Sequence, residues 1–181
     1  MTIVITLPGF HAGEAERIAQ FLQSGEIGLV HLRKPGSSEE QMEELVSRIP
    51  QELYGRLVVH DHFGLAVRYS LYGVHLNSRN PSSPSGWAGS VSRSCHSIGE
   101  VAECKARYDY VSLSPIFDSI SKKDYKAAFS REELLMAKDR GIIDSKVMAL
   151  GGVTFDKLSE VRALGFGGGM ILGDAWKDGQ G

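Results

Sequence analysis

The feature that most constrains the fold is the regular alternation of short β-branched or apolar runs with helix-like segments along all 181 residues. The expected strands cover residues 2–6, 28–33, 57–61, 73–76, 89–94, 109–113, 147–150 and 168–172. A spacing of about 20 residues per strand–helix unit suits a closed parallel barrel. We therefore predict an α/β fold, a compact (β/α)8 TIM barrel in a single domain over residues 1–181. An open doubly wound sheet is the alternative.

Local signals predict where several helices begin and end. Serines followed by glutamates at positions 37–40 are typical of a capped helix start, and Pro50 ends that helix. Ser130 and Thr154 are expected to cap two later helices. The Pro- and Ser-rich run 80–86 predicts a crossover without a full helix. The helix after residue 172 is expected to be short, which would leave apolar surface for a homodimer.

Composition narrows the class of partner. The formal net charge of −2 argues against nucleic acid as the default ligand. The first residues lack the pattern of a signal peptide, and no run approaches the length of a membrane span. We therefore expect a cytoplasmic protein with no membrane partner. Cys95 and Cys104 match no zinc-ligand spacing and do not imply a disulfide.

Polar side chains follow several expected strands at their C-terminal ends. Active sites in barrels lie at this end, so we predict that these side chains converge. The residues concerned are His31, Arg33, Lys34, His60, Asp61, His62, His75, Asn77, Arg79, Asn80, Ser94 and His96. For His60, His62 and His75, ordinary structural hydrogen bonding is an equally good interpretation.

Two glycine-rich segments and one polar loop indicate a phosphorylated ligand. Gly151 and Gly152 follow a strand, and a second glycine run precedes the strand that ends at Leu172 and Gly173. Glycines let backbone amides approach an anion, and barrel phosphate sites often lie at the last two loops. Tight turns alone are the alternative. The loop 114–124 combines hydroxyls with a lysine pair, which suits a diphosphate or a solvated surface equally.

At these segments the chain resembles the thiamine-phosphate synthase family, including its thiazole tautomerase branch. Residues 114–124 are similar to the family's G-P-[IV]-[FY]-x-T-x-T-K-x-D loop, and residues 149–153 to its A-[IL]-G-G-[IV] turn. The resemblance implies transfer of hydroxymethylpyrimidine from its diphosphate to thiazole phosphate, with Mg²⁺ and release of diphosphate. Small phosphorylated pyrimidine and thiazole compounds are then the expected partners.

The resemblance also implies roles for individual residues. The catalytic candidates are His96 and Lys122. Diphosphate or substrate ligands would be His31, Arg33, His60, Ser94, Ser119 and Ser121, and thiazole-phosphate ligands would be Gly151, Gly152, Leu172 and Gly173. Asp61 and Asn80 would hold the metal.

Several positions depart from the family pattern. His31 and His60 replace a glutamine and an asparagine, Pro35 replaces a lysine, and Asn80 replaces a metal-binding aspartate. Removing a carboxylate and a lysine weakens the diphosphate and Mg²⁺ half of the site, because Mg²⁺ favours carboxylates. Two alternatives to the synthase therefore stay open. One is a metal-independent tautomerase with His96 as acid and base, and the other is a sensor that binds thiazole phosphate without turnover.

Overall fold

The computed structural model describes residues 1–118 and 127–179. Its eight parallel strands follow one another in sequence order around a closed barrel. They are β1 (Thr2–Ile5), β2 (Leu29–Leu32), β3 (Leu57–Val59), β4 (Gly73–Leu76), β5 (Ser90–Cys95), β6 (Tyr110–Leu113), β7 (Val147–Ala149) and β8 (Gly168–Ile171). The predicted (β/α)8 barrel of the α/β class is confirmed, and the open doubly wound sheet is wrong.

The chain divides into two compact units, which are described one at a time. One unit is Ile3–Val91, and the other combines Met1–Thr2 with Ser92–Gly181. Every residue of β2, β3, β4, β6, β7 and β8 is buried. Burial of both faces is expected for parallel strands that helices cover. The single domain over residues 1–181 stays a prediction.

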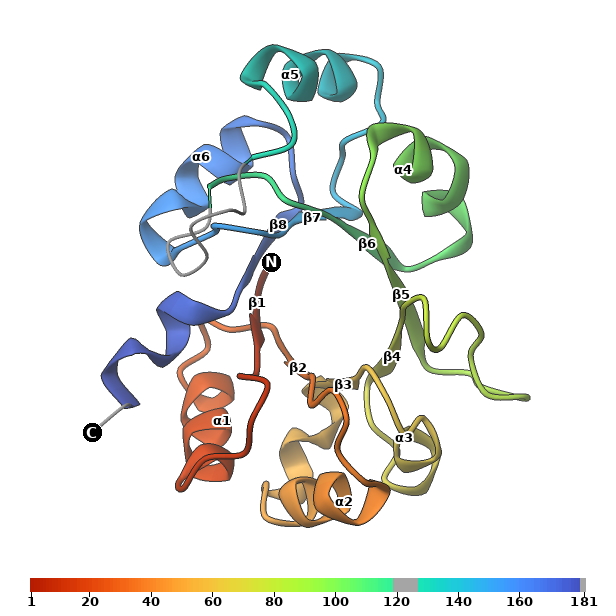
Figure 1. Ribbon diagram of the computed structural model, residues 1–181, viewed down its shortest axis with the longest axis vertical. Helices are drawn as coiled ribbons and strands as arrows, with labels where there is room; N and C mark the ends of the chain where they lie inside the picture. Colours follow the sequence, from red (N-terminus) through yellow and green to blue (C-terminus); the bar gives the residue numbers. More distant parts are fainter. Residues whose placement is uncertain (119–126, 180–181) are drawn as a thin grey trace. The chain divides into compact units, whose positions relative to one another are not determined.

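In the unit Ile3–Val91, the helices α1 (Glu14–Gln23), α2 (Glu39–Ser47) and α3 (Gly64–Arg68) lie outside its strands (Figure 1). A 3-10 helix, η1 (Gln51–Arg56), precedes β3. The expected cap of α2 is confirmed, since the Ser38 hydroxyl accepts from the Gln41 amide and the Gln41 side chain returns a bond to the Ser38 backbone. Residues 77–89 contain no helix, as the Pro- and Ser-rich run predicts.

The unit that contains Ser92–Gly181 has the helices α4 (Ile98–Cys104), α5 (Arg131–Asp139) and α6 (Leu158–Ala163). Its 3-10 helices are η2 (Lys105–Arg107), η3 (Phe155–Lys157) and η4 (Gly173–Gly179). The expected cap at Ser130 is confirmed by a capping box with Glu133. The described segment after β8 is the 3-10 helix η4, which is compatible with the predicted short final helix.

The expected cap at Thr154 is wrong, because the Thr154 side chain makes no capping hydrogen bond. The Thr154 hydroxyl is buried and has no partner among residues 1–118 and 127–179. The carboxylate of Asp174, which follows β8, instead accepts from the Phe155 amide at 3.0 Å. A carboxylate from another loop thus accepts from an unpaired backbone amide in the first turn. The 3-10 helix η3 therefore begins without a side-chain cap of its own.

The glycines before and within β8 allow a close approach of the chain start. The N-terminal ammonium of Met1 donates to the Gly167 carbonyl at 2.6 Å, and the Gly169 amide donates to the Met1 carbonyl at 3.2 Å. A Cβ at Gly168 would clash with the Met1 backbone, whose carbonyl carbon would lie 2.6 Å away. The glycines at positions 167 and 168 therefore serve backbone packing.

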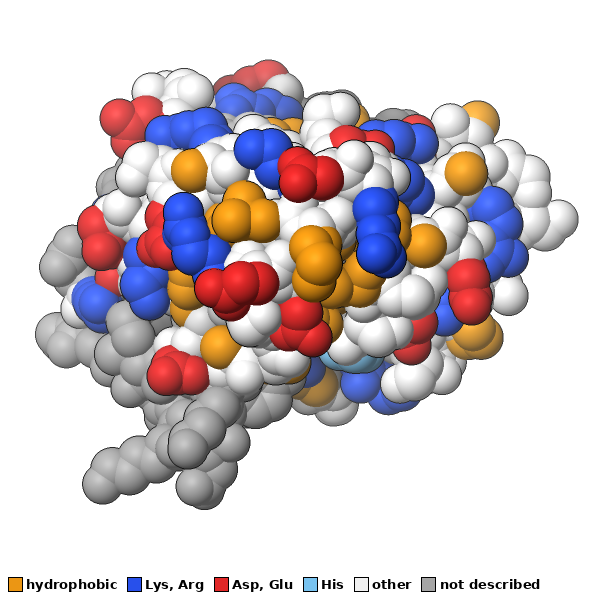
Figure 2. Space-filling view, turned by 90° about the horizontal axis from the view of Figure 1, so that it is seen from above, with side chains coloured by type: hydrophobic (Ala, Val, Ile, Leu, Met, Phe, Trp, Pro, Cys, Tyr) orange, Lys and Arg blue, Asp and Glu red, His pale blue; other side chains and the backbone are white. Residues whose placement is uncertain are grey.

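The face of the molecule in Figure 2 carries acidic and basic side chains interspersed with single hydrophobic ones. Such mixing is typical of a surface with a small net charge, here −2. In the part of the chain that the structure describes, no helix combines the length and the apolar character needed to cross a membrane.

Candidate active site

Three histidines meet at the C-terminal ends of β2, β3 and β4. His31 lies in β2, His75 in β4, and His60 directly follows β3. The Nδ1 atom of His31 lies 2.9 Å from Nε2 of His60. The rings of His60 and His75 stack with centroids 4.3 Å apart. Of the polar side chains that the sequence predicts to converge at this end, these three histidines do lie together.

Burial makes these histidines poor bases. Their exposed fractions are 0% for His31, 6% for His60 and 1% for His75. Desolvation, together with the charge of nearby Arg33, lowers the pKa of His75 from 6.5 to about 3. Burial also lowers the pKa values of His31 and His60 well below the usual value, with a contribution from His75. All three imidazoles are therefore neutral near pH 7.

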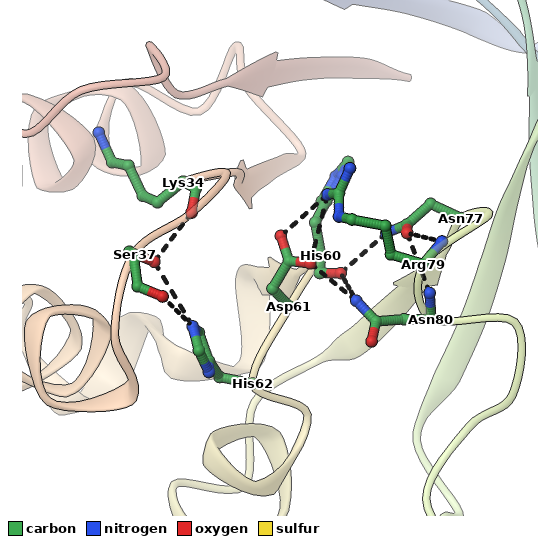
Figure 3. Close-up of polar contacts among 8 residues, drawn as sticks. All are labelled: Lys34, Ser37, His60, Asp61, His62, Asn77, Arg79 and Asn80. Carbon is green, nitrogen blue, oxygen red and sulfur yellow. Dashed lines mark hydrogen bonds and ion pairs between the residues drawn. The ribbon is translucent and has the colours of Figure 1, made fainter.

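Asp61 and Asn80, the predicted metal ligands, lie in direct contact (Figure 3). The Asn80 side-chain nitrogen donates to Asp61 Oδ1 at 2.7 Å and to the His60 carbonyl at 3.1 Å. Arg79 Nη2 lies 3.3 Å from both carboxylate oxygens of Asp61. Asn77 supports the loop, since it donates to the His60 carbonyl and accepts from the Arg79 and Asn80 amides. The pair is thus held at one end of β3, with a guanidinium as the present partner of the carboxylate.

Two neighbouring cations at the end of β2 have different environments. Lys34 is 1% exposed, and its Nζ contacts both carboxylate oxygens of Glu14 at 2.6 and 2.7 Å. It also donates to the carbonyls of Leu7 and Gly9. The half-buried Arg33 side chain has no hydrogen bond or ion pair within residues 1–118 and 127–179, although its charge acts on His60 and His75. Arg33 is therefore the cation available to a ligand.

In the second unit, His96 and Ser94 occupy the end of β5. His96 is exposed, and its Nδ1 lies 3.4 Å from the hydroxyl of buried Ser114. The Glu100 carboxylate accepts from the His96 backbone amide at 2.6 Å, which fixes the start of α4 together with the Ser97 cap. Ser94 is half-buried within β5. The His96 ring is thus oriented by one hydroxyl and open to solvent.

The turn after β7 packs against the loop after β6. Gly151 and Gly152 have φ values of 89° and 63°, which favour glycine. A Cβ at Gly152 would meet the Phe117 carbonyl oxygen at 2.7 Å. The Phe117 amide donates to the Gly151 carbonyl at 3.0 Å, and Lys157 Nζ lies 4.6 Å from the centre of the Phe117 ring. The glycines therefore meet a steric need, whereas their own amides donate to no acceptor within residues 1–118 and 127–179.

Three predicted substrate or catalytic residues, Ser119, Ser121 and Lys122, lie outside the described residues. The flanking residues are joined, because the Ala127 amide donates to Asp118 Oδ1 at 2.7 Å. Leu172 and Gly173 follow β8, and a Cβ at Gly173 would meet nothing within 4 Å. Both lie beside Asp174 at the start of η4, so the last loop has open space at one backbone position.

Sequence reasoning placed Arg79 and Asn77 among the polar residues at the strand ends without a ligand role, and it did not single out Lys157. Arg79 and Asn77 are polar residues of the same run as Asn80, and their position next to a predicted metal ligand is a usable signal. Lys157 lies in the first turn after the glycine pair, and its Nζ reaches the Gly152 carbonyl at 3.3 Å. The predicted helix start at Thr154 places Lys157 in the first turn, so the sequence did contain a signal for it.

The closed parallel barrel, with polar side chains at its strand ends, places the chain in the (β/α)8-barrel class. The family model for thiamine monophosphate synthase matches residues 2–172. The chain is 27% identical to the thiamine-phosphate synthase of Photorhabdus laumondii over 161 residues, covering 83% of this chain and 73% of that protein. It is 26% identical to that of Serratia proteamaculans over 168 residues, covering 87% and 77% of the two chains.

A crystal structure of thiamine phosphate pyrophosphorylase from Bacteroides thetaiotaomicron superimposes with a TM-score of 0.87 at 44% identity, covering 97% of this chain and 84% of that one. The corresponding protein of Pyrococcus furiosus has a TM-score of 0.73 at 21% identity, covering 97% and 90% of the two chains, and supports the fold alone. The chain belongs to the thiamine monophosphate synthase family. The predicted family, the assignment to thiamine biosynthesis and the transferase class are confirmed.

Proposed function

We propose that this chain is a thiamine-phosphate synthase that transfers hydroxymethylpyrimidine from its diphosphate to thiazole phosphate and releases diphosphate. The family match over residues 2–172 supports the reaction class. The observation that carries the assignment at residue level is the contact of Asp61 with Asn80 at 2.7 Å, in the same unit as the ligand-accessible Arg33. A cytoplasmic location and a homodimer remain parts of the same proposal.

Asp61 and Asn80 are the residues that would hold Mg²⁺. Their donor set fits this ion, because Mg²⁺ in proteins commonly takes one or two carboxylates together with substrate phosphates and water. The carboxylate of Asp61 already attracts a cation, Arg79, at 3.3 Å, and the Asn80 amide can rotate to present its oxygen. When bound, Mg²⁺ would neutralise charge on the diphosphate leaving group.

The chain's own cations then bind the diphosphate. Arg33 offers a planar guanidinium that can take two phosphate oxygens at once. The family resemblance assigns Ser94, Ser119, Ser121 and Lys122 to the diphosphate as well. Lys34 is not part of this set, because the Glu14 carboxylate and two carbonyls use its three donors. Stabilising the departing diphosphate is the main requirement of such a transfer.

Thiazole phosphate is assigned to the turn after β7 and the loop after β8. The amides of Gly151 and Gly152 point to no protein acceptor in the described ranges, and Leu172 and Gly173 offer further backbone donors. Backbone amides at such turns bind phosphate without a side-chain charge. His96, exposed and 3.4 Å from Ser114, is positioned to exchange a proton with the bound heterocycle.

The decisive experiment follows thiamine phosphate formation from hydroxymethylpyrimidine diphosphate and thiazole phosphate, with and without Mg²⁺. We expect Mg²⁺-dependent turnover that Asp61→Ala abolishes and Arg33→Gln lowers by about 100-fold or more, because each removes charge stabilisation of the leaving group. His62→Gln is the matched control, since the His62 side chain bonds only to Ser37 in the described chain. Chelator-resistant isomerisation of an aminothiazole carboxylate phosphate, lost in His96→Asn, would instead establish the tautomerase. Binding of thiazole phosphate without either reaction would establish the sensor.

A further inference from the structure

The histidine cluster is defined as His31, His60 and His75. The family resemblance assigns His31 and His60 to the substrate, but it gives no role to His75 and no reason for the three rings to meet. One ligand atom from each side chain lies within 4.8 Å of the others. Among residues 1–118 and 127–179 it is the one group of three or more histidine, cysteine or acidic side chains with this spacing. Three imidazole rings brought this close together inside a barrel present several nitrogen atoms to one small volume, which is the arrangement of a metal site.

We propose that the histidine cluster binds one divalent transition-metal ion of the zinc class through three imidazole nitrogens. The fourth position would be open to water or to an anionic oxygen. This ion is distinct from the Mg²⁺ assigned to Asp61 and Asn80, because nitrogen ligands suit zinc and oxygen ligands suit magnesium. The proposal stands whether or not the synthase assignment is correct.

The distances fit an ion with little rearrangement. Zinc–nitrogen bonds measure about 2.0–2.1 Å, so two ligands of a tetrahedral ion lie about 3.3 Å apart. His31 Nδ1 and His60 Nε2 are 2.9 Å apart, slightly closer than that. The remaining separations, up to 4.8 Å, must shorten by up to about 1.5 Å. Side-chain torsions can supply a movement of this size without a change in the strands.

The backbone explains why the three rings meet. Register pairs Val59 of β3 with Val74 of β4, so the next residues, His60 and His75, fall opposite each other. Their rings lie almost parallel, with an angle of 27° between the planes. The ring of His31 approaches both edge-on, with centroids 5.1 Å from His60 and 5.2 Å from His75. Strands of a barrel fix these directions more firmly than a loop would.

The chemical state of the rings also fits. A histidine binds a metal as the neutral imidazole, and burial keeps the His75 ring in that form. His60, at 6%, is the most exposed of the three rings. Three protein ligands and one open position form the donor set that zinc takes in sites that also bind a water or substrate.

Nearby cations weaken the site but do not prevent it. Arg33 and Arg79 both act electrostatically on His60. The Asp61 carboxylate offsets Arg79, since the two groups lie 3.3 Å apart. Arg33 has no such partner in the described chain. We therefore expect the Arg33→Gln variant to bind the ion more tightly than the unchanged protein. The same substitution is expected to lower synthase turnover.

The test is a titration of chelator-treated full-length protein with Zn²⁺ in competition with a chromophoric chelator, and separately with Co²⁺. We expect one ion per chain and visible Co²⁺ ligand-field bands without a thiolate charge-transfer band. His31→Gln and His75→Asn should each weaken binding by at least about 100-fold, because even outer-shell changes cost 10–100-fold. His62→Gln and the double variant Cys95→Ser/Cys104→Ser should leave affinity unchanged.

X-ray absorption by the zinc-loaded unchanged protein decides the matter even if the variants do not fold. Three imidazole rings around the ion would support the proposal. Sulfur neighbours would overturn it and assign the ion to Cys95 and Cys104, whose Sγ atoms lie 3.4 Å apart. Oxygen neighbours alone would assign it to surface carboxylates. The absence of stoichiometric binding would mean that the cluster is a hydrogen-bonded core.

Discussion

Acidification should destabilise this protein through its buried histidines, and His75 allows the size of the effect to be calculated. Its pKa is about 3 in the folded chain against 6.5 for an ordinary histidine. Between these values the unfolded chain binds a proton that the folded chain does not. Stability is therefore complete above the ordinary value and is lost as the pH falls from 6.5 towards 3.

The magnitude follows from linkage. Each pH unit below the unfolded pKa costs about 1.4 kcal/mol per proton. From about pH 7 to about pH 5, His75 alone should lower the free energy of unfolding by about 2 kcal/mol. The shifts of His31 and His60 have the same direction, so the total loss should be larger. A loss of this size is a large part of the stability of an ordinary domain.

Urea unfolding in the presence of a chelator, repeated across this pH range, measures the effect. Two single-tryptophan variants, one with only Trp87 and one with only Trp176, report on the unfolding of the two units separately by fluorescence. The variant His75→Gln should lose about 2 kcal/mol less than the unchanged protein between the two pH values. The exposed His11 supplies the control His11→Gln, which should leave the pH dependence unchanged. An equal pH dependence in His75→Gln and the unchanged protein would refute the reasoning.

Three further changes probe other parts of the molecule. Lys34→Met leaves the Glu14 carboxylate buried without its ion pair and should lower the unfolding free energy by about 3–5 kcal/mol in urea titrations, a loss that adding Glu14→Gln should largely reverse. In Gly152→Ala the new Cβ would lie 2.7 Å from the Phe117 carbonyl oxygen, at a residue with positive φ. Calorimetry should therefore show weaker thiazole-phosphate binding, and the free energy of unfolding should fall by more than about 1 kcal/mol. Asn80→Asp adds a carboxylate and should lower the Mg²⁺ concentration for half-maximal activity, whereas an unchanged Mg²⁺ dependence would remove position 80 from the metal site.

The fold could be predicted because its signals are local and repeated. Alternating strand and helix patterns at a short period leave few arrangements besides a barrel. Ser38 and Ser130 show the same locality, since each cap bond forms within three residues of the hydroxyl. Thr154 was predicted by the same rule and is wrong, because Asp174 from a later loop supplies the acceptor. Local rules fail where a distant residue competes for the same amide.

Arg33 and Lys34 show why the site was only partly predictable. Both are cations at the end of one strand, and the sequence offers no local reason to separate them. Lys34 is removed from the ligand-binding groups by Glu14, which lies 20 positions earlier in the first turn of α1. Alternation along the chain indicates which residues lie near a strand end. It does not indicate which of them an ion pair across the fold will bury.

The two histidine replacements have to be considered together. His31 and His60 stand where the family resemblance places an amide side chain, and an amide offers a donor and an acceptor at the same time. A neutral imidazole has one donor and one acceptor nitrogen, and the 2.9 Å contact between these rings uses one of each. Replacing His31 by alanine removes the partner of a buried His60 nitrogen, which costs about 1–3 kcal/mol. Glutamine at position 31 keeps a donor and an acceptor. The double replacement His31→Gln/His60→Asn, which supplies an amide at both positions, should therefore cost less stability than His31→Ala.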